Sequence, residues 1–426
     1  MSNTFLRWAW LSLLLASTPA RAQGPAAASP TKEAPVTLHQ ALKLAEKSAP
    51  TIHVARAEAK AGRAEVDAAS PLLPSDPVLF GSVGRRTTAA GSGIDYSIGL
   101  EQEIDVAGKR SKRLDAARSD LAARRAELSA SKWSVHQRVH AAYHRAIVAR
   151  ERLAAAGRVL RFSERVVDVA RQRLSAGETS PLPVRLAETQ LAEARQERMR
   201  SQSAYNRVRL ELGRWVGWTG AGLLTPTGRL HAPRVPPPAE TLLRRARHEQ
   251  PALVAARARS AAAHAGLRSA ERSAWPNPTL GVVVESEAEP GAEAAHIVRG
   301  TLSLPLPLWV GGTPERARAR ARVIRARAEH GALTSDLRAR VLEAREHAHT
   351  GARRARVYGS EILPTLEKNL ELLRKSFELG EIDVLDVLVA QERFLRGQQD
   401  ALAAFQDYYD AWARLEAIVG VELGDP

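Results

Sequence analysis

Apolar positions follow a helical spacing over most of the chain. Between Lys109 and Ala176 there is no proline and a single glycine, Gly157, while residues such as Leu114, Ala117 and Leu121 recur every three or four positions. A continuous helix of roughly 65 residues would be ~100 Å long, which is longer than any compact core. The pattern therefore predicts very long helices that pack through small side chains in coiled-coil fashion.

A second long helical stretch runs from Glu315 to Leu379. It is interrupted by Gly331, Gly351, Gly359 and Pro364. Because proline removes a backbone donor and clashes with the preceding turn, a kink is expected near Pro364.

Two short regions alternate apolar and polar residues with period two, which predicts strands. The run from Ile94 to Ile104 is the clearest, and polar loops at Arg85–Gly93 and Glu287–Ala295 would close two hairpins. Such alternation suits either a barrel wall between lipid and water or a half-buried soluble hairpin. The positions expected to face lipid are Ile94, Tyr96, Ile98, Leu100, Leu280, Val282, Val284, Val298 and Leu302.

The chain divides into two similar halves offset by about two hundred positions. Each half reads as a helix, two strands, a very long helix, a turn and a helix. Four strands cannot close a barrel alone, so a membrane location would require oligomerisation. The matched segments are Leu73–Pro77 with Trp275–Pro278, Gly177–Val184 with Gly380–Val387, and Leu212–Gly217 with Leu415–Gly420.

Domain boundaries follow from this repeat, with the Gly- and Pro-rich stretch from Thr219 to Pro238 read as a linker rather than an element. The expected organisation is a signal peptide at 1–22, an N-terminal segment and first-repeat helix at 23–77, hairpin 1 at 78–104, a helical hairpin at 105–218, a linker and equatorial region at 219–250, a second-repeat helix at 251–278, hairpin 2 at 279–308, a second helical hairpin at 309–420 and a tail at 421–426.

The N-terminus has the features of a secretory signal. Arg7 precedes the apolar stretch Trp8–Ala16, and Ala20–Ala22 is a small-x-small cleavage pattern before Gln23. The mature protein is therefore expected outside the cytoplasm. Beyond this segment no window approaches the ~18 apolar residues of a membrane-spanning helix.

The composition argues against several classes of function. The formal charge is +15, but the cations are mostly arginines scattered with a helical period, without a basic block or interleaved aromatics, so we expect no nucleic-acid partner. Cysteine is absent, which excludes disulfides, thiolate zinc sites and lipidation on cysteine. Neither a phosphate loop nor a nucleophile elbow is present, so no enzyme activity and no cofactor are expected.

One histidine stripe could in principle bind a metal. His136, His140 and His144 stand four residues apart on one helical face, the spacing that lets imidazoles share an ion. The alternative, which we favour from the sequence, is a solvated face of a long surface helix.

The two repeat turns contain residues that typically end one helix and begin the next. Gly177 and Gly380 can adopt the left-handed conformation that ends a helix. Ser180 and Asp383 are expected to cap the next helix, with Pro181 at its first position in the first copy.

Several of these segments resemble the TolC-like outer-membrane efflux proteins over essentially the whole mature chain. The resemblance is sharpest in Gln102–Arg110 and in Ile362–Pro364 through Gly380–Leu388 to Gln391, and its Gly108-Lys109-Arg110 run is closest to the heavy-metal cation branch. It implies a mainly α fold with a small membrane β part: a homotrimer in which each chain gives four strands to an outer-membrane barrel and its helices to a periplasmic tunnel. It also implies a periplasmic adaptor and an inner-membrane transporter as partners, with outer-membrane lipid around the strands.

In that family the turns form the periplasmic tips that close the tunnel and meet the adaptor. Asp386 falls where the family often places an acidic residue at the constriction, and three symmetry-related carboxylates there would attract cations. Asp383 and Asp386 could instead serve only to stabilise the helix start. The tip and adaptor residues implied are Gly177, Glu178, Ser180, Leu182, Gly380, Glu381 and Leu385.

The sequence leaves three functional hypotheses open. The leading hypothesis is an exit duct of a tripartite efflux pump, with metal cations somewhat favoured over drugs as cargo. An exit duct for protein secretion would use the same fold. A secreted coiled-coil scaffold, which never enters a membrane, would instead be water-soluble.

Overall fold

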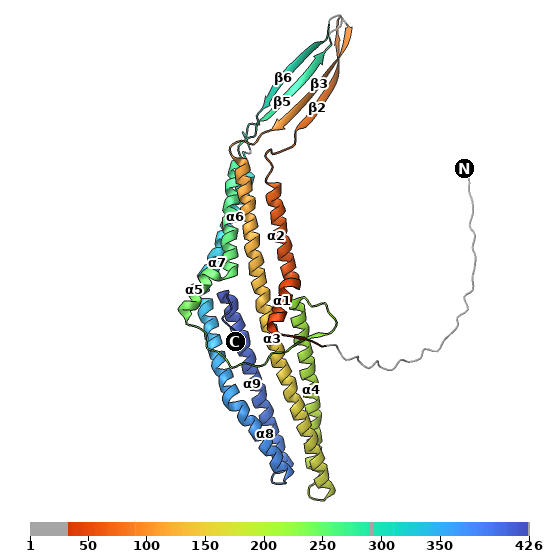
Figure 1. The fold of residues 1–426 in the computed structure, drawn as a ribbon, viewed down its shortest axis with the longest axis vertical. Coiled ribbons are helices and arrows are strands. Elements are labelled where there is room, and N and C mark those ends of the chain that lie inside the picture. The colour runs from red at the N-terminus through yellow and green to blue at the C-terminus, as the bar shows by residue number, and fades with distance from the viewer. Residues whose placement is uncertain (1–32, 90, 289–292, 310, 425–426) are drawn as a thin grey trace, which may run out of the picture.

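The computed structural model describes residues 33–89, 91–288, 293–309 and 311–424, so the expected signal peptide lies outside the described residues. The molecule is elongated, with a four-stranded sheet at one end and two helical hairpins reaching the other end (Figure 1). The elements are β1 (Glu33–Val36), α1 (Leu38–Ser48), α2 (Pro50–Ala68), β2 (Val78–Thr88), β3 (Gly91–Glu103), α3 (Lys109–Ser175), α4 (Pro181–Val216), β4 (Leu223–Pro226), α5 (Ala239–Glu249), α6 (Pro251–Ser273), β5 (Thr279–Glu287), β6 (Ala295–Ser303), α7 (Thr313–Val357), a π-helical turn (Tyr358–Ile362), α8 (Leu363–Glu378) and α9 (Val384–Val419).

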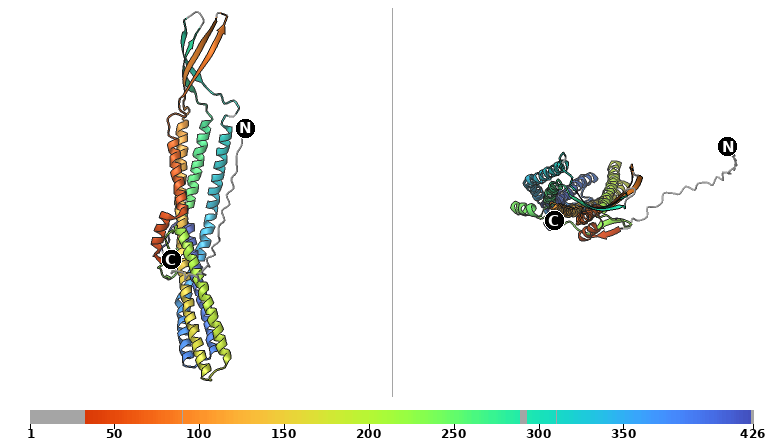
Figure 2. Two further views of the ribbon diagram at one scale, coloured as in Figure 1. Left: turned by 90° about the vertical axis from the view of Figure 1, so that its right-hand side faces the viewer. Right: turned by 90° about the horizontal axis from the view of Figure 1, so that it is seen from above.

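The fold class is confirmed: the protein is mainly helical, with a small β part and two structural repeats. Helix α3 is continuous over 67 residues, within one residue of the predicted end. The second long helix runs unbroken through Gly331 and Gly351 as α7, so those two glycines do not interrupt it. The interruption expected at Gly359 and Pro364 is present, because a π-helical turn over Tyr358–Ile362 separates α7 from α8. Figure 2 shows the helices running side by side along the long axis.

Small side chains fill the helix interfaces. Alanines such as Ala146, Ala170 and Ala348 are fully buried, which lets backbones approach closely over a great length. A cluster of large aromatic residues lies in the middle of the molecule, where Tyr408, Tyr409 and Trp412 of α9 pack beside Val148 of α3 and Ala352 of α7.

The linker between the repeats is more ordered than predicted. It contains β4, which pairs in parallel with β1. The guanidinium of Arg209, only 4% exposed, donates to the carbonyls of Leu223 and Leu224. Farther along, the hydroxyls of Tyr409 and Tyr408 accept from the backbone N–H groups of His231 and Arg234 at 2.9 Å. These long-range partners, which local sequence cannot reveal, satisfy the backbone of a proline-rich segment.

The repeat also contains short helices that the predicted order omitted. The helix before each hairpin is divided, by Ala49 into α1 and α2 and by Gln250 into α5 and α6, and the next residue is proline at the first helical position. In the central aromatic cluster of α3, α7 and α9, burial of the tyrosine ring raises the pKa of Tyr408 to about 12.

Candidate functional site: the sheet, the junction and the tips

The sheet has the order β2-β3-β5-β6 with every pair antiparallel. Its register places Ile98 opposite Val284 and Leu100 opposite Val282, and Leu280 opposite Leu302, so the alternating apolar residues form one face across the strands. All nine residues predicted to face lipid are exposed, from 43% for Val284 to 72% for Val298. The predicted loop Arg85–Gly93 is wrong, because β2 and β3 continue almost to its middle.

The opposite face of the sheet is polar. Arg86 pairs with Asp95 at 2.9 Å and with Glu287 at 3.0 Å, and Arg299 pairs with Glu285 at 2.9 Å. Val283, which breaks the alternation in the sequence, faces this side opposite Gly99 and Arg299 and is 6% exposed. The sheet thus separates an apolar surface from a charged one.

The two outer strands leave their edges open. Within the described chain, β2 and β6 pair on one side only, with β3 and β5 respectively. Long edges with free backbone donors and acceptors recruit further strands.

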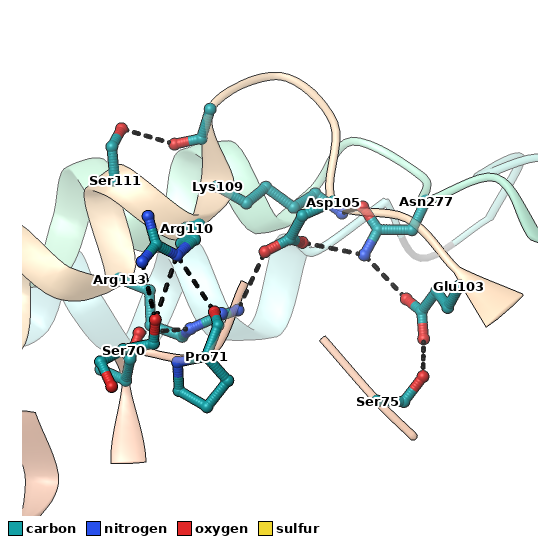
Figure 3. A network of polar contacts seen from close by, with 12 residues as sticks. Ser70, Pro71, Ser75, Glu103, Asp105, Lys109, Arg110, Ser111, Arg113 and Asn277 are labelled. Carbon is teal, nitrogen blue, oxygen red and sulfur yellow. Dashed lines mark hydrogen bonds and ion pairs between the residues drawn. The ribbon is translucent and has the colours of Figure 1, made fainter. Parts of the chain in front are cut away.

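A polar network joins the sheet to the helices (Figure 3). Asn277 donates to Glu103 at 2.7 Å and to Asp105 at 3.2 Å, and it accepts from the Lys109 ammonium at 2.6 Å. Asp105, whose side chain is 8% exposed, also pairs with Arg113 at 3.3 Å. Burial lowers the pKa of Lys109, although Asp105 and Glu103 partly offset that effect.

The same network fixes the connection that enters β2. Arg110 donates to the carbonyls of Ser70 and Pro71, while Gln102 donates to the carbonyl of Ser75. These contacts give a structural reason for the Gln102–Arg110 run that stands out in the sequence.

The strand-to-helix turn has the same backbone in both repeats. Ala107 and Gly108 have φ of 58° and 67°, while Gly311 and Gly312 have 47° and 68°. Ala107 is the non-glycine residue with positive φ in the described chain, a conformation that costs an L-residue roughly 1 kcal/mol. Sequence reasoning missed that Gly311 and Gly312 form the matching turn.

The two tip turns are as predicted in backbone conformation. Gly177 and Gly380 have φ of 78° and 81°, and Pro181 takes the first helical turn. Asp383 caps α9 by accepting from the Val384 N–H at 2.7 Å. Ser180 has cap-like backbone angles but makes no side-chain cap hydrogen bond, so that part of the prediction is wrong.

The remaining tip residues lie at the surface. Leu182 and Leu385 are exposed by 64% and 57%, and Glu178, Glu381 and Asp386 are also exposed. These side chains are available to another protein or another copy of the chain.

Arg173, which sequence reasoning missed, ties the two tips together. From the end of α3 it donates to the Phe377 carbonyl of α8 at 2.7 Å, and its guanidinium stacks over the Phe377 ring at 4.8 Å. Beneath it, Val166, Val184 and Val387 belong to a shared apolar cluster. A single arginine in an arginine-rich helix carries no sequence signal for such a contact.

The histidine stripe is not a solvated face, which corrects the prediction. His140 and His144 are 5% and 4% exposed, and the ring of His144 stacks on Tyr409 at 4.4 Å. The helix face turns inward because α9 packs against it. Burial, followed by the neighbouring His140 and His231, holds the pKa of His144 well below its usual value. Among the described residues no three His, Asp or Glu side chains gather to hold a metal ion.

No helix in the described part of the chain is both long and apolar enough to cross a membrane. The architecture is instead that of a duplicated protein in which a two-faced sheet is joined to long helical hairpins. The profile of the outer membrane efflux protein family matches residues 41–217 and 242–421, and the chain belongs to that family.

Individual relatives agree with this assignment. The cobalt-zinc-cadmium resistance protein CzcC of Cupriavidus metallidurans is 25% identical over 319 residues, covering 74% of this chain and 75% of CzcC. The pyoverdine export outer membrane protein OpmQ of Pseudomonas putida is 26% identical over 397 residues, covering 87% and 82%. The CmeC outer membrane channel of Campylobacter jejuni has the same fold, with a TM-score of 0.71 at 14% identity over 90% of this chain and 85% of CmeC. The protein is thus an outer-membrane efflux protein that extends into the periplasm.

Proposed function

We propose that three copies of this chain form the outer-membrane exit duct of a tripartite efflux pump. The observation that carries the proposal is the sheet, which has one apolar face, one charged face and two open edges. Joining β2 of one copy to β6 of the next would satisfy those edges and place lipid outside and water inside.

The helical hairpins would continue this duct through the periplasm. Their exposed leucines and acidic residues at the tips would meet a periplasmic adaptor, which connects to an inner-membrane transporter. The role is conduction, and it requires no catalysis or cofactor.

Metal cations are the favoured cargo in this proposal. The support is the similarity to CzcC and the Gly108-Lys109-Arg110 run. Organic molecules are the second candidate, because OpmQ matches a longer part of the chain.

Growth of a deletion strain and its complemented parent tests the cargo. Cobalt, zinc, cadmium, copper and silver would be compared with drugs and detergents. Sensitivity confined to metals supports a metal duct, while sensitivity confined to organic compounds contradicts it. Full resistance of the deletion strain to every compound would contradict the efflux role itself.

The gate is tested separately through Asp386. It is exposed in the first turn of α9, and three copies near the axis would hold a ring of negative charge. Asp386→Ala should raise single-channel conductance and reduce cation preference in planar bilayers. Asp400→Ala is the matched control, since Asp400 is exposed on the same helix about 20 Å farther along. Unchanged conductance and selectivity in Asp386→Ala would retire this gate.

A further inference from the structure

Large apolar side chains continue below the sheet, where the membrane part meets the helices. In the connection from β6 to α7, Leu306 and Leu308 are 66% and 69% exposed and Trp309 is 90% exposed. Trp275, in the connection from α6 to β5 at the same end of the sheet, is 59% exposed. The first connection follows directly after β6, whose Leu302 is 71% exposed, so exposed apolar side chains continue beyond the end of that strand.

The helices next to these connections form one curved layer. Helix α2 packs on α3, α3 on α6 and α6 on α7. One face of the layer encloses an open hollow of about 950 Å³ lined by all four helices. On this face Arg124 contacts Glu58 and Glu65, while Arg259 contacts Glu127 and Glu329.

The opposite face carries arginines without such partners. Arg118, Arg268 and Arg320 each stand two residues from hollow-lining positions on both sides, which places them about 200° around their helices. Together with Arg272 they are exposed, and none forms an ion pair within the described chain. All four lie within about 15 Å of the helix ends that adjoin the sheet. We call these four residues the basic collar.

We propose that the basic collar and the adjoining Trp275 and Leu306–Trp309 surface bind anionic phospholipids of the periplasmic leaflet of the outer membrane. Tryptophan rings sit at the headgroup level of membranes, and arginines just outside pair with lipid phosphates. An anionic polymer without an apolar part would leave the exposed tryptophans and leucines uncovered, which favours lipid. The inference rests on the outer-membrane location and the proposed trimeric barrel.

Lipid retention by the purified full-length protein tests the proposal. The detergent-solubilised protein would be mixed with equal amounts of phosphatidylglycerol and phosphatidylcholine, and bound lipids counted by native mass spectrometry. Wild type should prefer phosphatidylglycerol roughly tenfold, and R118Q/R268Q/R272Q should lose that preference. The matched control R185Q/R195Q/R198Q removes the same charge from exposed positions on α4, far from the sheet, and should keep it.

Two further experiments ask whether the bound phosphate belongs to a lipid and whether Trp309 lies at the level of the lipid headgroups. Millimolar inorganic phosphate should not displace phosphatidylglycerol; displacement would indicate a soluble-anion site and overturn the proposal. In liposomes, lipids brominated near the headgroup should quench wild-type fluorescence more than that of W309F, and equal quenching would place Trp309 outside the membrane.

The remaining outcomes separate this inference from the proposed function. A protein that fractionates with the outer membrane and forms trimers, yet shows no lipid preference, would overturn the inference alone. Binding to purified peptidoglycan that requires the collar, with lipid retention unaffected, would do the same. Failure of the wild type to reach the outer membrane would contradict both the lipid-binding inference and the proposed exit duct.

Discussion

The two strand-to-helix junctions share a backbone path but differ in their side chains. Both turn through two consecutive left-handed residues. The first junction is held from within by Asp105, Lys109 and Asn277, whereas the second carries the exposed Leu306–Trp309 surface. The comparison teaches that the two repeats share the geometry of the turn but use it differently. The first turn holds the sheet to the helices through a polar network, and the second presents an exposed apolar surface.

The largest expected effect comes from removing the internal anchor. Asp105→Ala should lower the free energy of unfolding by about 2–3 kcal/mol, because Arg113 loses its ion-pair partner and Asn277 loses an acceptor at a buried carboxylate. Thermal unfolding of the detergent-solubilised protein measures it. Glu315→Ala is the control in the second junction, where the exposed carboxylate has no ion pair within the described chain, and a loss as large there would abolish the contrast.

Exchanging small residues at the turn sharpens the comparison further. Gly312→Ala should destabilise by about 1–2 kcal/mol, because φ is 68° and the new Cβ would lie 3.0 Å from the Cβ of Ala274. Ala107→Gly should stabilise by about 1 kcal/mol by relieving the left-handed alanine. Denaturant midpoints of the two variants should move in opposite directions; movement in the same direction would refute a shared strained turn.

The two repeats also differ in the burial of histidines on their long helices. The pKa of His144 is depressed in the folded protein, so between that value and its ordinary 6.5 the unfolded chain binds more protons. Its contribution to stability is therefore complete above pH 6.5 and is lost as pH falls through the folded pKa.

Replacing His144 by Phe should accordingly reduce the loss of stability between pH 7 and 5 by about 1 kcal/mol. The groups that face it are His140, His231 and the Tyr409 ring, so His140 must be kept intact in this comparison. His347→Phe is the control on α7, where the side chain is 60% exposed. Identical pH profiles for wild type and His144→Phe would remove His144 as the cause.

Periodicity made the architecture predictable, because a helix of this length without proline has few alternatives and the period-two pattern fixes the faces of the strands. What the sequence could not supply were contacts between distant segments. The ring of His144 stacks on Tyr409 of α9, strand β4 pairs with the distant β1, and Arg173 donates to a carbonyl of α8.

Positions with an unusual backbone were also beyond the sequence pattern. Ala107 gives no local hint of a positive φ, because glycine is the residue that normally marks such a turn. Comparison with Gly311 in the second repeat is the signal that could have found it.

Cross-linking between copies tests most directly the claim that three copies join through β2 and β6. Because the sequence has no cysteine, each cross-link must come from the introduced residues. Ser82→Cys on the edge strand β2 would be combined in turn with cysteine at Ile297, Arg299 or Thr301 on β6. Mild oxidation in isolated outer membranes should convert at least one pair into a covalent species that stops at three copies. A protein that stays monomeric in every pair, or that forms ladders longer than a trimer, would contradict the duct.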